Sequence, residues 1–170
     1  MNTSRRDFLK LGATGALLLG FGLPVRGQTG AAPFAPNAFL RIDRAGKVTF
    51  ISPMIEMGQG TFTSLPMLIA EELEVDVGSV SVENSPPDDK VYVNPLIGIQ
   101  MTGGSTAVRS MYVPLRQAGA TVRVMLVSAA AQRWKVDPST CRAEQGSVVH
   151  APSGRNASAR RRWRGFLRDD

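Results

Sequence analysis

A glycine-rich turn runs directly into an amphipathic helical pattern in residues 56–73, which read EMGQGTFTSLPMLIAEEL. After Thr61, apolar side chains recur at the spacing of one helix face: Phe62, Leu65, Leu68, Ile69 and Leu73. Pro66 falls early in this run, near the first turn, where a helix tolerates proline best. The pattern therefore predicts a helix over residues 61–75 that packs one face on a core.

Short strands and a second, longer helix are predicted around this segment. The second helix covers about residues 106–134, and Pro114 should kink or divide it. Apolar alternation and turn residues predict strands at residues 39–43, 47–52, 80–84, 141–144 and 147–151. The order of these elements predicts an α+β fold of short antiparallel strands and hairpins with two main helices.

The composition excludes several classes of protein. The 170 residues are enough for about one domain, and a single cysteine, Cys141, excludes an internal disulfide and a structural zinc site. The net charge of +6 comes from the ends of the chain, because residues 27–154 carry ten basic and eleven acidic residues. A near-neutral body offers no surface that could follow a phosphate backbone, so we expect no nucleic-acid partner.

The first 27 residues resemble an export signal of the twin-arginine type. Arg5 and Arg6 are followed by Phe8 and Leu9, and the apolar stretch 11–23 is too short for the roughly 20 residues of a membrane span. We therefore expect a periplasmic or membrane-associated protein that touches the membrane only through residues 1–27. The twin-arginine route exports folded proteins, which suits a cofactor inserted before export. Residues 28–37, rich in Gly, Ala and Pro, are interpreted as a linker.

Two glycine-rich loops, each placed before a helix, are the candidate cofactor-binding sites. The first contains Gly58, Gln59 and Gly60, where the glutamine amide can donate and accept hydrogen bonds and the following helix N-terminus favours an anion. The second contains Gly103, Gly104 and Ser105, whose amides and hydroxyl suit a phosphate or a pterin edge. Taken alone, either loop is more often a tight turn, and neither matches a Rossmann fingerprint or a P-loop.

With their flanking residues, the two loops resemble a known family. Residues 56–73 and 100–109 are similar to successive cofactor loops in the molybdopterin-binding subunit of the xanthine dehydrogenase/aldehyde oxidase family, and residues 134–150 resemble its next hairpin. The isoquinoline 1-oxidoreductase beta-subunit type is the most similar. The resemblance covers about residues 36–154 and implies that residues 38–154 are the N-terminal part of a molybdopterin-binding domain.

The resemblance implies a cofactor, a reaction and partners. The cofactor would be molybdenum bound by molybdopterin cytosine dinucleotide, with Gln59 near the metal's oxo ligand and with Gly103, Gly104 and Ser105 touching the cofactor. The family oxidises N-heteroaromatic compounds or aldehydes with water as the oxygen source. It passes electrons to an iron–sulfur small subunit that carries 2Fe-2S clusters.

Two departures from the family pattern limit the expected activity. Members are several hundred residues longer, and no position here matches their catalytic glutamate, so Glu56, Glu71 and Glu72 are not assigned that role. Residues 155–170 carry six arginines and do not resemble the family, so they are interpreted as a basic tail, non-native or disordered, that a frameshift could have produced. We expect the isolated chain to be an inactive fragment of a molybdenum hydroxylase.

Two alternatives remain open at this point. A body of about 125 residues can bury a modest core, so the chain could be a non-enzymatic exported small α+β binding module. The arginine-rich tail could instead bind nucleic acid or an anionic membrane, although only one short segment supports this function.

Overall fold

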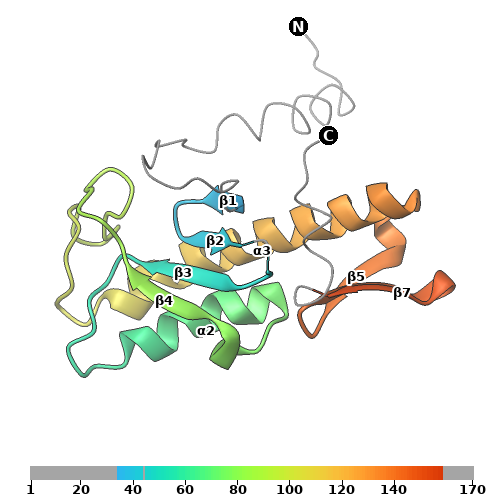
Figure 1. The fold of residues 1–170 in the computed structure, drawn as a ribbon. Coiled ribbons are helices and arrows are strands. Elements are labelled where there is room, and N and C mark those ends of the chain that lie inside the picture. Colours follow the sequence, from blue (N-terminus) through green and yellow to red (C-terminus); the bar gives the residue numbers. More distant parts are fainter. Residues whose placement is uncertain (1–33, 44, 159–170) are drawn as a thin grey trace, which may run out of the picture.

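The computed structural model describes residues 34–43 and 45–158, and the predicted signal segment and residues 159–170 lie outside this range. Helices and strands are arranged in two groups, with a four-stranded sheet beside two helices and a three-stranded sheet near the end of the long helix (Figure 1). The helices are α2 (Thr61–Leu73) and α3 (Ala107–Trp134). The strands are β1 (Phe34–Asn37), β2 (Leu40–Ile42), β3 (Val48–Ser52), β4 (Ser81–Asn84), β5 (Cys141–Glu144), β6 (Ser147–His150) and β7 (Arg155–Ser158).

The larger sheet has the order β1-β2-β3-β4, and its pairs are antiparallel except for β3 and β4. In the parallel pair, Phe50 lies opposite Val82. A parallel pair needs a crossover connection, and α2 forms it between β3 and β4. The α+β class with two main helices is thus confirmed, while the parallel pair is a feature that the prediction of antiparallel strands did not include.

Two predicted boundaries are wrong because backbone pairing extends past them. Residues 34–37, assigned to the linker 28–37, form β1 against β2. Residues 155–158, assigned to the basic tail, form β7 against β6, and Ala157 is only 3% exposed. In both places the backbone N–H and C=O groups at the edge of a strand pair with the neighbouring segment. Amino-acid composition does not predict such pairing.

The long helix is not divided at its proline. Helix α3 runs from Ala107 to Trp134 with Pro114 inside it, so the predicted division is wrong. A proline removes one backbone hydrogen bond from the helix. Met111 and Leu115, on either side of Pro114, are buried, so both halves of the helix pack on the core. Among the described residues, no helix is long and apolar enough to cross a membrane.

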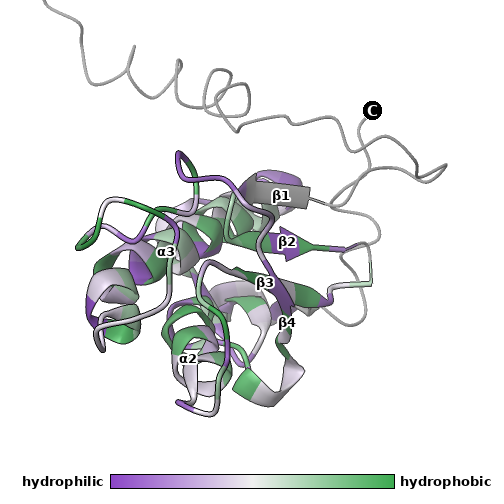
Figure 2. Ribbon diagram, turned by 90° about the vertical axis from the view of Figure 1, so that its left-hand side faces the viewer, coloured by the Kyte–Doolittle hydropathy of each residue, from purple (hydrophilic) through white to green (hydrophobic). Residues whose placement is uncertain are grey.

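The hydrophobic core lies between the larger sheet and the two helices. Figure 2 shows α2 and α3 next to the strands, with hydrophobic residues on both helices. Burying a large apolar side chain contributes about 1.5–3 kcal/mol, so this cluster is the main source of stability. The core residues are Leu40, Ile42, Val48, Phe50, Met54, Leu65, Ile69, Leu73, Ala107, Met111, Leu115 and Val122.

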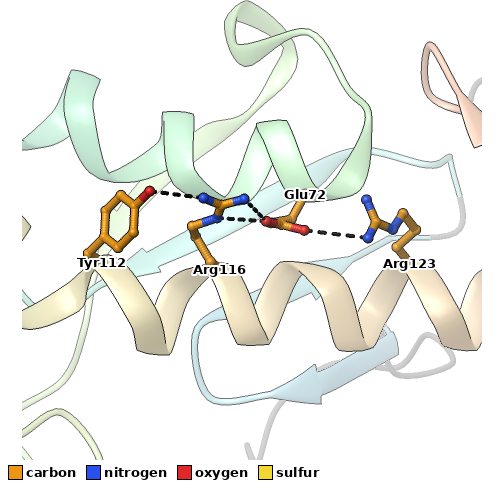
Figure 3. A network of polar contacts seen from close by, with 4 residues as sticks. All are labelled: Glu72, Tyr112, Arg116 and Arg123. Atoms are coloured by element: carbon orange, nitrogen blue, oxygen red, sulfur yellow. Dashed lines mark hydrogen bonds and ion pairs between the residues drawn. The ribbon is translucent and has the colours of Figure 1, made fainter.

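A polar network and a glycine join α2 to α3. The Glu72 side chain, 12% exposed, accepts from Arg116 Nε at 2.7 Å and lies 3.5 Å from Arg123 Nη2 (Figure 3). Arg116 also donates to the Tyr112 hydroxyl at 2.9 Å. Next to this network, a Cβ added at Gly119 would lie 2.9 Å from Glu72 Cβ, so the two helix backbones approach closely there.

Candidate functional site

The structure brings the two predicted glycine loops together at one end of the molecule. Helices α2 and α3 both begin at this end (Figure 1), so the loop that precedes each helix lies there too. The hydroxyl of Thr102, in the second loop, accepts a hydrogen bond from the Ile55 N–H, just before the first loop, at 2.8 Å. Residues 58–60 and 103–105, about 45 positions apart in sequence, therefore belong to segments that a direct hydrogen bond joins.

Glu56 holds the first loop in place with its carboxylate. Oε1 accepts from the N–H groups of Gly58 at 2.7 Å and Gly60 at 3.0 Å, and Oε2 accepts from the Phe62 N–H at 2.9 Å. These donors, with Phe62 the strongest and Gly60 next, lower the pKa of Glu56 from 4.5 to about 2. The chain's own carboxylate thus lies at the α2 N-terminus, the place that the sequence predicted to favour an anion.

Gln59 turns its amide back onto its own loop. Nε2 donates to the Ile55 carbonyl at 2.7 Å, and Oε1 accepts from the Met57 N–H at 2.6 Å. The residue is exposed at the loop surface. The loop turns at Gly60, whose φ of 82° is a backbone angle that residues with a side chain rarely adopt. Gln59 can therefore reach a ligand outside the loop only by exchanging these internal hydrogen bonds.

The second loop differs from the first because its backbone donors are free. No described residue accepts a hydrogen bond from the N–H of Gly103, Gly104 or Ser105. Gly104 and Ser105 are exposed and have left-handed φ values of 60° and 52°. Adjacent free amides in such a turn form a concave set of donors for phosphate or carbonyl oxygens. This donor set fits the phosphate or carbonyl oxygens of an anionic ligand.

The sequence did not indicate a role for Asn94, a buried residue that hydrogen-bonds to both ends of the second loop. Asn94 is 0% exposed, and its Nδ2 donates to the Thr106 hydroxyl at 2.7 Å and to the Met101 carbonyl at 3.3 Å. In the sequence it stands at the end of a turn-rich loop after the strand predicted at 80–84, where no role was predicted for it. The Asn-Pro dipeptide at 94–95 is a turn marker, and it is the local signal that could have drawn attention to this position.

Exposed apolar side chains surround the two loops. Large apolar side chains that are exposed near a candidate site can mark a place where a ligand or another protein segment binds. They come from both sides of the inter-loop hydrogen bond: Ile55, Met57, Leu96, Ile97, Ile99 and Met101. In residues 34–43 and 45–158, no group of three or more His, Cys, Asp or Glu side chains could hold a metal ion.

Known proteins with similar sequences are components of enzymes. A family model described as a molybdopterin cofactor-binding domain matches residues 6–166, beyond the range 36–154 over which the motifs show resemblance. The chain is 38% identical to the beta subunit of isoquinoline 1-oxidoreductase from Brevundimonas diminuta, over 91% of this chain and 21% of that protein. It is 29% identical to one of the subunits of nicotinate dehydrogenase from Pseudomonas putida, over 65% of this chain and 9% of that protein.

A third relative is a membrane-bound aldehyde dehydrogenase (pyrroloquinoline-quinone) of Gluconacetobacter polyoxogenes, 31% identical over 81% of this chain and 18% of that protein. The chain thus spans about a fifth or less of the length of these curated relatives.

Solved structures show the same fold. Quinoline 2-oxidoreductase from Pseudomonas putida 86 aligns with a TM-score of 0.55 at 21% identity, over 74% of this chain and 15% of that one. The Cu,Mo-CO dehydrogenase aligns with a TM-score of 0.56 at 18% identity, over 77% of this chain and 17% of that one. At these identities the likeness concerns the arrangement of helices and strands.

Proposed function

Since this chain belongs to the molybdopterin cofactor-binding domain family, we propose that its two glycine loops hold part of a molybdenum cofactor in a molybdenum hydroxylase large subunit. The observation that carries the proposal is the set of N–H donors at Gly103, Gly104 and Ser105 that no described residue uses, joined to the first loop by the Thr102–Ile55 hydrogen bond. These donors would bind phosphate or pterin oxygens. The hydrogen bond to the first loop would hold the two loops in a fixed position relative to each other.

The first loop would orient the bound cofactor. Glu56 fixes the backbone through three hydrogen bonds, from the N–H groups of Gly58, Gly60 and Phe62, so the loop should keep its shape whether or not a ligand is present. Gln59 would turn its amide outward to the bound metal centre by giving up its bonds with the Ile55 carbonyl and the Met57 N–H. When bound, the molybdenum cofactor supplies the redox chemistry by which oxygen from water is added to the substrate.

Substrate, cofactor form, partner and location are further parts of this proposal. The names of the relatives support an N-heteroaromatic compound or an aldehyde as the substrate, and an assembly with other subunits. We propose the cytosine dinucleotide form of molybdopterin, an iron–sulfur small subunit with 2Fe-2S clusters, and twin-arginine export to the periplasm. The relatives are named as oxidoreductases or dehydrogenases, which does not favour a non-enzymatic binding module. Because no residue here is assigned as the catalytic glutamate, the chain alone should be inactive.

Cofactor analysis of the full chain, purified from its native host, tests the proposal. Molybdenum is measured by elemental mass spectrometry, and the pterin is extracted and identified. Gly104→Ala places a methyl group in the donor set, whereas Gly154→Ala introduces the same change at a similar φ, 65° against 60°, far from the loops. We expect molybdenum in the wild type and in Gly154→Ala, and a several-fold lower content in Gly104→Ala. A wild-type chain without molybdenum, or equal contents in both variants, contradicts the proposal.

A further inference from the structure

Asn94 is a fully buried polar side chain whose hydrogen-bonding groups all have partners. Both Nδ2 donors are used, one by the Thr106 hydroxyl and one by the Met101 carbonyl, and Oδ1 accepts from the Leu96 N–H at 3.1 Å. An amide buried without partners costs about 1–3 kcal/mol by mutational measures, so its environment must supply them. The acceptors of the two Nδ2 donors, Thr106 and Met101, both come from the segment that contains the second glycine loop.

The partners lie at the two ends of this loop. Met101 comes shortly before Gly103, and Thr106 directly follows Ser105. One planar NH₂ group therefore fixes the distance between the start and the end of residues 102–105. No other described side chain bonds to both ends of this loop.

The same contacts determine which way the loop amides point. The Thr106 hydroxyl, which accepts from Asn94, donates to the Gly103 carbonyl at 2.7 Å and so holds this carbonyl toward the interior. In a planar trans peptide the N–H points opposite to the C=O, so the N–H of Gly104 must point away from the interior. The Gly103 carbonyl also accepts from the Thr106 N–H at 3.2 Å, so the outward donor of the loop follows from this turn together with the buried chain from Asn94 through Thr106 to Gly103.

We propose that Asn94 is a positioning residue that presents the Gly103–Ser105 amides to the cofactor, an inference that rests on the proposed function of this loop. Because its side chain is fully buried, Asn94 would not touch the cofactor itself. It acts through the Thr106 hydroxyl, which orients the peptide unit between Gly103 and Gly104.

The test compares Asn94→Asp with Gln100→Glu in the full chain. Asn94→Asp keeps the shape and the acceptor of residue 94 but removes both donors to the loop ends. Gln100→Glu makes the same chemical change nearby, where Nε2 donates instead to the Ser85 hydroxyl at 2.8 Å and the Pro86 carbonyl at 3.1 Å. Thr106→Val removes the linking hydroxyl, and Thr106→Ser restores it, so the proposal stays testable if Asn94→Asp fails to fold.

The measurement is ¹⁵N relaxation of the backbone amides, together with molybdenum content. We expect order parameters at residues 103–105 to fall from about 0.85 to below about 0.6 in Asn94→Asp and Thr106→Val, with α2 unchanged. They should stay at the wild-type value in Gln100→Glu and Thr106→Ser. Unchanged order at residues 103–105 in both Asn94→Asp and Thr106→Val overturns the inference, whatever the molybdenum content. Altered loop order in a wild-type background that holds no molybdenum leaves the positioning role standing and contradicts the proposed function instead.

Discussion

Replacing Gly119 with alanine should destabilise the fold, although alanine is the better helix former. The new Cβ would lie 2.9 Å from Glu72 Cβ and 3.1 Å from the Ile69 carbonyl oxygen. Neither atom can rotate away, because one is fixed to the α2 backbone and the other belongs to it. Helices α2 and α3 must therefore move apart, which also lengthens the contacts of Glu72 with Arg116 and Arg123.

The size of the effect follows from two opposing terms. Alanine is favoured over glycine in a helix interior by about 0.8–1 kcal/mol. Overpacking against fixed atoms costs about 1–3 kcal/mol, and the loosened Glu72 network adds to this loss. We expect a net decrease in the free energy of unfolding of about 1–2 kcal/mol. For a chain of 170 residues, the decrease corresponds to a Tm lower by roughly 2–8 °C.

Thermal and urea unfolding of the full chain, followed by circular dichroism, measures this change. Gln117→Ala is the matched control, because Gln117 is exposed on the same helix two positions earlier. The control should stay within about 0.5 kcal/mol of the wild type. A Gly119→Ala variant as stable as the wild type, or more stable, would refute the close approach of the two helices.

Three further outcomes are expected. The pKa of Glu56 is lowered from 4.5 to about 2, so its contribution to stability is present above pH 4.5 and is lost as the pH falls toward 2. Glu56→Gln should therefore remove the decrease in Tm that this group causes between pH 4.5 and 2, in Tm values measured from about pH 2 to 6. Thr102→Val removes the acceptor of the Ile55 N–H and should speed hydrogen exchange of that amide several-fold, while Thr102→Ser should leave the exchange rate as in the wild type. Deleting residues 159–170 should leave the Tm within about 2 °C of the wild-type value. Deleting residues 155–170 should lower the Tm further, because Ala157 is buried and β7 pairs with β6. Equal Tm values for the two deletions would contradict a stabilising role of β7.

Local sequence patterns predicted most of the secondary structure. The helical stripe after Thr61 became α2, and the alternation around Gln145 and Gly146 became the β5–β6 hairpin. Such patterns work because helix and hairpin hydrogen bonds join residues only a few positions apart. The predicted positions Gly58–Gly60 and Gly103–Ser105 also prove to be neighbours, and family membership is confirmed. Their contact with a cofactor stays a prediction.

The features that the sequence did not predict are contacts that form only in the folded chain. The pairing of β1 with β2, the occupation of the α2 N-terminus by Glu56, and the bonds from Asn94 to both ends of the second loop were not predicted. The sequence specifies which side chains can donate, accept or pack, because these are properties of each residue and its near neighbours. Which donor meets which acceptor depends on segments folded against one another, since a buried polar group takes whichever partner the packed core places within reach.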